Sequence, residues 1–221
     1  MLHGLTHPGV AGSELAHLLS RLSRLADDAP AATRPVFAER LGHWLGWTGA
    51  VALSAALNSS PAVPAPRACR DGDEEADFLR VRAGLLASIA AGLREGASSP
   101  TDFGPYRRHC AGLQQAMQEA IAALRQRLRL ALSRRSAALA RLAAIDAVLD
   151  QALAARERGL LAAVPLRLQA HFERLQQAAG ADARWQDDFC HDMDRLLRAE
   201  LEHRLVPSQG LLDALHTASP S

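Results

Sequence analysis

Two Glu-x-x-His pairs are the residues of this sequence that most suggest metal chemistry: Glu14 with His17, and Glu200 with His203. Residues three apart lie on one side of a helix, and in di-metal helical bundles two such pairs bind the ions together with two further glutamates. On a helical wheel, His17 falls opposite its neighbouring leucines, whereas Glu200 lies near an apolar face where Arg204 can pair with it. No internal duplication completes a four-ligand set. We therefore predict no metal site and keep a metal-dependent bundle enzyme as an alternative.

The three cysteines, Cys69, Cys110 and Cys190, follow no metal-binding spacing. His109 and His191 each adjoin a cysteine, but neighbours on a helix diverge by about 100°, so such a pair does not chelate easily. We expect Cys110 and Cys190 to be buried, reduced thiols, as in a cytoplasmic protein. The sequence contains no glycine-rich phosphate loop, GxSxG motif or paired-carboxylate signature. We therefore predict no catalytic residue, no cofactor and no enzymatic activity.

The strongest functional signal is a run of arginines with no acidic residue among them. The six are Arg125, Arg127, Arg129, Arg134, Arg135 and Arg141. The apolar pattern slips at residues 133–136, so we expect a turn there and the arginines at the tip of a helical hairpin. A positive tip suits an acidic protein, an anionic membrane or nucleic-acid phosphates. Because no aromatic stacking group or groove-reading motif is nearby, we favour a protein or membrane-complex partner over nucleic acid.

The arginine run also has a purely structural interpretation. The tip can simply be solvated, or its arginines can pair within the molecule with the acidic residues of the last predicted helix. Those acids are Asp187, Asp188, Asp192, Asp194, Glu200 and Glu202.

A second signal is the motif WLGW, in which Trp44 and Trp47 lie on one face of a helix. The pair can either fill the core or anchor a partner. Tryptophan is scarce in this chain, with three in 221 residues, so we favour the core.

Composition sets the broad class. The chain is 48% hydrophobic but only 4% aromatic, and its 45 alanines and 36 leucines favour thin, closely packed helices. All 25 basic residues are arginine, and the net charge of +1 makes no general case for nucleic acid or membrane. The most apolar run, residues 41–57, is short for a bilayer span, and the first residues do not resemble a secretory signal. We expect a cytoplasmic protein without a transmembrane span.

The first 72 residues predict a small helical unit and a linker. Apolar spacing and capping residues indicate helices over 13–26, 33–47 and 48–58. Residues 59–72 contain three prolines and read as a flexible or polyproline-like linker.

Residues 73–221 predict a long antiparallel helical bundle. In the helix expected from about residue 105, apolar side chains step by threes and fours, the seam of a coiled-coil-like hairpin. That seam comprises Cys110, Leu113, Met117, Ile121, Leu124, Leu128 and Ala131. Further helices are expected over 73–96 and over 136–180, the second with a kink at Pro165. The last long helix is expected to begin at 182 and to end at Pro207 and Gly210. A short tail helix should follow it.

We therefore predict an all-α fold in three parts: an N-terminal helical unit (1–58), a Pro-rich linker (59–72) and the bundle (73–221).

Four stretches of this sequence resemble a proteobacterial family, domain of unknown function 3348. They are FAERLGHWLGWTGAVALSAAL (37–57), DFGPYRRH (102–109), ALARLAAIDAVLDQALAARERGLLAAVP (138–165) and FCHDMDRLLRAELEHRL (189–205), the last followed by GLLDAL. The resemblance implies no activity, cofactor or catalytic residue. Family members resemble cytoplasmic products encoded beside ion-driven stator and OmpA-like membrane proteins, which implies a partner class.

These observations predict a cytoplasmic bacterial interaction or adaptor protein, accessory to a membrane complex of the ion-driven or OmpA-like type. The candidate partner-binding residues are the six arginines of the run together with Trp44 and Trp47. The alternatives are a nucleic-acid-binding protein that uses the arginine-rich tip and, less favoured, a metal-dependent enzyme. Self-association is left open.

Overall fold

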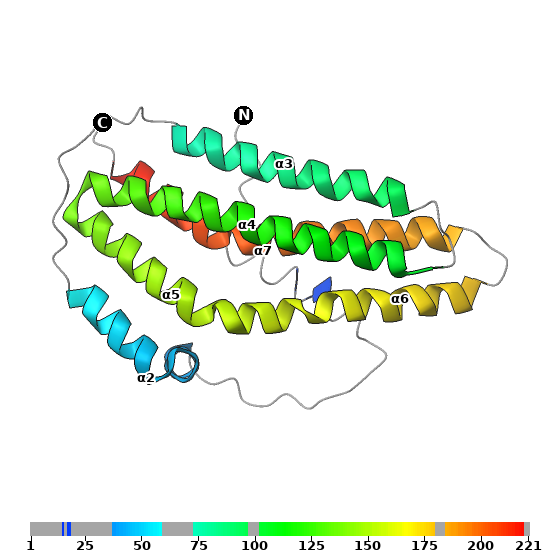
Figure 1. The fold of residues 1–221 in the computed structure, drawn as a ribbon, viewed down its shortest axis with the longest axis horizontal. Coiled ribbons are helices and arrows are strands. Elements are labelled where there is room, and N and C mark those ends of the chain that lie inside the picture. The colour runs from blue at the N-terminus through cyan, green and yellow to red at the C-terminus, as the bar shows by residue number, and fades with distance from the viewer. Residues whose placement is uncertain are drawn as a thin grey trace.

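The fold is all-α, as predicted. The computed structural model describes residues 15, 17–18, 37–58, 73–96, 102–179 and 184–218, and no strand occurs among them. Its helices are α2 (Phe37–Asn58), α3 (Asp73–Gly96), α4 (Gly104–Arg135), α5 (Ala137–Leu161), α6 (Ala163–Ala179) and α7 (Arg184–Thr217). Helices α3 to α7 form a long bundle in which successive rods run in opposite directions, and α5 and α6 together make one rod (Figure 1).

Helix α4 lies at the centre of the bundle and packs against α3, α5 and α7. Its buried side chains recur every three or four residues, which keeps them on one face. They are Tyr106, Cys110, Leu113, Met117, Ile121, Leu124, Leu128 and Leu132. The predicted seam is thus confirmed up to Leu128; beyond it Leu132, not Ala131, is fully buried.

The predicted turn between α4 and α5 is confirmed at Ser136. This residue is extended (φ −158°, ψ 162°), and its hydroxyl accepts a hydrogen bond from the Leu139 amide at 3.2 Å. That bond satisfies one of the amides that a helix start leaves without a partner. The hairpin therefore has a sharp, capped turn.

The long helix predicted over residues 136–180 is interrupted where expected. Helix α5 ends at Leu161 and α6 begins at Ala163, two residues before Pro165. Ala162 between them keeps right-handed helical angles (φ −60°, ψ −21°), so the chain continues along the same rod (Figure 1). The prediction of a kink instead of a reversal is confirmed.

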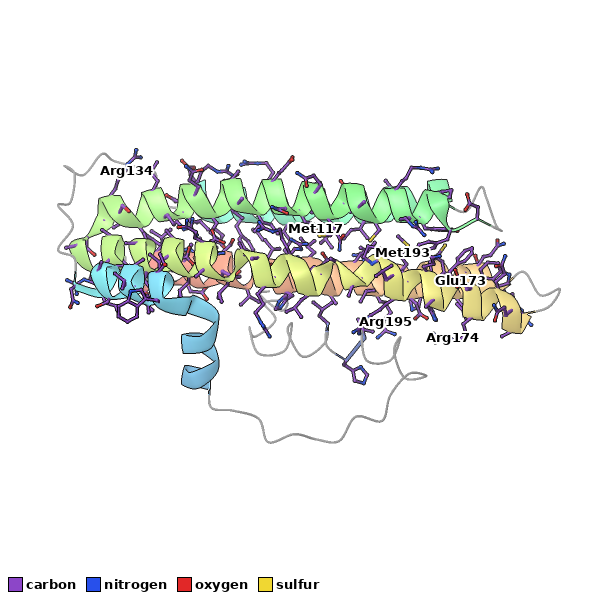
Figure 2. All side chains as sticks on the ribbon, turned by 60° about the horizontal axis from the view of Figure 1, so that its bottom comes forward. Met117, Arg134, Glu173, Arg174, Met193 and Arg195 are labelled. Carbon is purple, nitrogen blue, oxygen red and sulfur yellow. The ribbon has the colours of Figure 1, made fainter. Side chains whose placement is uncertain are left out.

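Helix α2 consists of two stretches that meet at Gly46. This glycine has φ 59° and ψ −178°, a conformation essentially restricted to glycine, and it turns the chain sharply (Figure 2). The sequence predicted two short helices with a boundary one or two residues later. Of the bundle helices, α2 packs on α5 among the described residues.

The prediction that Pro207 and Gly210 end the last helix is wrong. Helix α7 continues through both residues to Thr217. Proline removes one backbone hydrogen bond, but Pro207 is exposed, and the apolar stripe continues on the buried side. Burial of Leu205, Leu211 and Leu215 outweighs the lost bond.

Two of the earlier predictions concern residues that are largely outside the described part. The linker 59–72 lies wholly outside it. Of the helix expected over 13–26, Leu15 and Leu18 are buried in the core and His17 is exposed, as the helical wheel suggested. None of the described helices is long and apolar enough to cross a membrane.

Candidate functional site

Arg125, Arg127 and Arg129 of the arginine run form ion pairs within the molecule. Arg125 and Arg129 of α4 face Asp146 and Asp150 of α5 across the hairpin. Arg125 Nη2 lies 2.6 Å from Asp146 Oδ1 and Arg125 Nη1 lies 2.8 Å from Asp150 Oδ1. Arg129 Nε lies 2.6 Å from Asp146 Oδ2 and Arg129 Nη2 lies 2.7 Å from Asp150 Oδ2. Both guanidinium groups are thus shared between both carboxylates.

We call these four residues the hairpin clamp. The side chains of Arg125, Arg129 and Asp146 are only 13%, 20% and 12% exposed, so water screens the pairs weakly. The signal that could have revealed the clamp is distance from the turn. In an antiparallel hairpin that turns at Ser136, residues equally far before and after the turn face each other, and this places Arg125 close to Asp146.

The remaining arginines of the run have different surroundings. Arg127 Nη2 is 2.6 Å from Asp77 Oδ2 of α3. Arg134 extends from the end of α4 near the turn (Figure 2), and Arg135 and Arg141 flank the same turn. The run therefore contains no acidic residue in the sequence, but acidic residues of other helices lie beside some of its arginines in the fold. The acids that pair with Arg125, Arg127 and Arg129 come from α3 and α5, whereas the structural interpretation had expected them from the last helix.

Trp47 lies on the outside of the molecule. Its side chain is 85% exposed, so the favoured prediction of a core tryptophan is wrong for this residue. Val51 and Leu57 are each 51% exposed on the same helix, whereas Ala56 is buried. The second stretch of α2 thus buries the small Ala56 and leaves bulky side chains such as Trp47 outside. The side chain of Trp44 lies outside the described part.

A buried polar cluster lies where α4, α7 and the break between α5 and α6 meet. Glu200 of α7 is 0% exposed. It accepts hydrogen bonds from Arg204 Nη2 at 2.8 Å and from Gln114 Nε2 at 3.1 Å. The predicted pairing of Glu200 with Arg204 is confirmed, and the Gln114 contact was missed.

Gln114 also donates to the carbonyl oxygen of Leu161 at 3.2 Å. In an unbroken helix that oxygen would accept from the amide of residue 165, which is a proline and has none. The Gln114 side chain thus replaces the hydrogen bond that Pro165 removes. A buried carbonyl without any partner would cost about 1–3 kcal/mol.

The two described cysteines are structural in character. Cys110 is fully buried, and burial together with the nearby Glu200 charge raises the pKa of its thiol to about 12. Burial also raises the pKa of the half-buried Cys190, whose sulfur lies 3.7 Å from Tyr106 Oη. Raised thiol pKa values disfavour the reactive thiolate. Within the described residues, no group of three or more His, Cys, Asp or Glu side chains could share a metal ion.

A pocket of about 710 Å³ lies between α4, α5 and α7, next to the hairpin clamp. Its apolar wall consists of Met117, Ile121, Leu153, Leu160, Val206 and Pro207. Sequence periodicity could not reveal the pocket, because it depends on how far α5 diverges from α7.

The fold and these surfaces define an all-α helical-bundle protein with an outward apolar helix face and an arginine-rich pocket. The family model for "Protein of unknown function (DUF3348)" matches residues 1–217, and the chain belongs to that family. The family resemblance seen in the sequence is thereby confirmed. Neither a curated protein nor a solved structure matches the chain.

Proposed function

We propose that this protein is a helical adaptor that binds a protein partner on the outward face of the second stretch of α2. The observation that carries the proposal is the 85% exposure of Trp47. Tryptophan is the residue most enriched among those that dominate binding energies at interfaces, and burying one at a partner surface is strongly favourable. Val51 and Leu57 extend the apolar surface along the same helix.

The partner class comes from the family resemblance. It is a component of an ion-driven or OmpA-like membrane complex, met from the cytoplasm. Arg134, in the last turn of α4, adds positive charge near the hairpin turn for an acidic partner. The ion pairs of Arg125, Arg127 and Arg129 speak against nucleic acid, because they occupy half of the run within the molecule.

The test is co-expression with ion-driven and OmpA-like membrane proteins of the source organism, followed by co-purification. The Trp47→Ser/Val51→Ser variant should reduce recovery of the partner at least tenfold while its circular dichroism stays unchanged. Leu79→Ser is the matched control, since Leu79 is 49% exposed on α3. Equal recovery with both variants, or partner loss on nuclease treatment, would contradict the proposal.

A further inference from the structure

The pocket between α4, α5 and α7 has the size and lining of a small-molecule site. Its volume of about 710 Å³ falls within the range of about 300–1,000 Å³ that is typical of ligand pockets. Met117 and Ile121 form a buried apolar floor, and Leu153 and Val206 face the same space from α5 and α7. An apolar chain that binds there would move out of water and into contact with apolar side chains, which is favourable.

Two attachments hold the part of α5 that lines the pocket. The hairpin clamp fixes the first half of α5 to α4, and Gln114 binds its last carbonyl oxygen, that of Leu161. Most of the α5 residues that line the pocket, which run from Ala147 to Leu160, lie between these two attachments. The space is therefore built into the hairpin and does not depend on a flexible loop.

Most of the arginines around the pocket have acidic partners, but one at its rim has none among the described residues. Five arginines line it, and the clamp aspartates balance Arg125 and Arg129, while Glu200 balances Arg204. On the last turns of α5, Arg156, Glu157 and Arg158 also line the pocket. Arg158 is exposed at the rim, with no ion pair or side-chain hydrogen bond to any residue that the structure describes. Arg158 thus places a positive charge beside an apolar wall.

We propose that this pocket binds an amphiphile with one anionic head group and an apolar chain, such as a long-chain carboxylate. The chain lies along the floor formed by Met117 and Ile121, and the head group pairs with Arg158 at the rim, where charge-assisted hydrogen bonds to a carboxylate are strong. The pocket shares no residue with the α2 face, so this inference is independent of the adaptor proposal.

The test is isothermal titration calorimetry of the full chain with dodecanoate, below its critical micelle concentration. Dodecanol and dodecyltrimethylammonium provide the same chain with a neutral and a cationic head group. We expect dodecanoate to bind with one-to-one stoichiometry, at least tenfold more tightly than either analogue. Octanoate should bind at least tenfold more weakly than dodecanoate, because four methylenes fewer are buried.

Two pairs of variants locate the site. Ala122→Trp places a large side chain in the pocket and should abolish binding, whereas Ala123→Trp, at an exposed position outside the lining, should not change it. Arg158→Gln should weaken dodecanoate binding at least fivefold, whereas Arg134→Gln, which changes an arginine outside the lining, should not. If Ala122→Trp loses helix content, two comparisons still test the proposal. They are Arg158→Gln against Arg134→Gln, and the three head groups against one another.

Three results would overturn the proposal. Absence of dodecanoate binding would do so directly. Equal binding of all three head groups would show that the pocket selects only apolar chains. Unchanged binding in Arg158→Gln would show that the anionic head group does not pair with Arg158.

Discussion

At the scale of single residues, Asp146 shows how strongly burial alters the contribution of an ion pair to stability. It binds two arginines whose side chains are mostly shielded from water, whereas Asp194 binds one arginine, Arg198, that is 42% exposed on α7. Removing one partner of a shielded pair leaves a charge poorly solvated, but removing one partner of an exposed pair costs little.

We therefore expect Asp146→Asn to lower the free energy of unfolding by about 2–4 kcal/mol. Asp194→Asn, the matched control, should change it by no more than about 0.5 kcal/mol. Urea unfolding followed by circular dichroism measures both values. Similar small effects in the two variants would mean that the hairpin clamp does not stabilise the hairpin.

The Cys110 thiol predicts a pH dependence. Its pKa is about 12 in the folded protein and 9.0 ordinarily, so between these values the unfolded chain loses a proton that the folded chain keeps. Folded stability from this group is complete below pH 9.0 and falls as the pH rises towards 12, with a limiting slope of about 1.4 kcal/mol per pH unit.

The measurement compares the original chain with Cys110→Ala by urea unfolding at several pH values from 8 to 10.5. The variant lacks the titrating group, so its deficit in unfolding free energy should shrink as the pH rises. A deficit that stays constant over this range would show that the thiol ionises alike in both states.

At the scale of helices, the break between α5 and α6 is stabilised from outside the rod. Gln114 supplies the hydrogen bond that Pro165 cannot, and the same amide binds Glu200. The break, the central helix and α7 are thus joined through one side chain.

This arrangement predicts coupling between two distant positions. Gln114→Leu should lower the free energy of unfolding by about 1–3 kcal/mol, because Leu161 and Glu200 each lose a donor. In a Pro165→Ala background the cost should be smaller, since the new amide at residue 165 can bind the Leu161 carbonyl. A double-mutant cycle measured by urea unfolding gives the coupling energy. Purely additive effects would show that Gln114 does not replace the hydrogen bond that Pro165 removes.

At the scale of the whole molecule, helix positions were predictable because they depend on local spacing. The turn at Ser136, the break near Pro165 and the stripe of α4 all follow from residues close together in sequence. The partners of Arg125 and the exposure of Trp47 were not predictable in the same way, because they depend on which helices become neighbours. The continuation of α7 through Pro207 likewise depends on packing that the tail residues gain from the bundle.

The three-part division of the chain remains a prediction, and the bundle provides its test. Among the described helices α2 packs on α5 alone, so residues 73–221 expressed by themselves should keep their helix content and unfold cooperatively. Their free energy of unfolding should be lower by about 2–5 kcal/mol, because Leu15 and Leu18 are missing from the core. Circular dichroism and urea unfolding measure both properties. Loss of cooperative unfolding would show that the first residues are an integral part of the bundle.

Gln114 compensates for the amide that Pro165 lacks, and this relation also constrains the order in which the two residues can be substituted. Replacing the proline first leaves the Leu161 carbonyl with a choice of donors, so a later replacement of the glutamine costs less stability. Replacing the glutamine first passes through a destabilised intermediate. Sequences descended from this one should therefore reach a straight α5–α6 rod by losing the proline before the glutamine, a one-way route set by a single carbonyl oxygen.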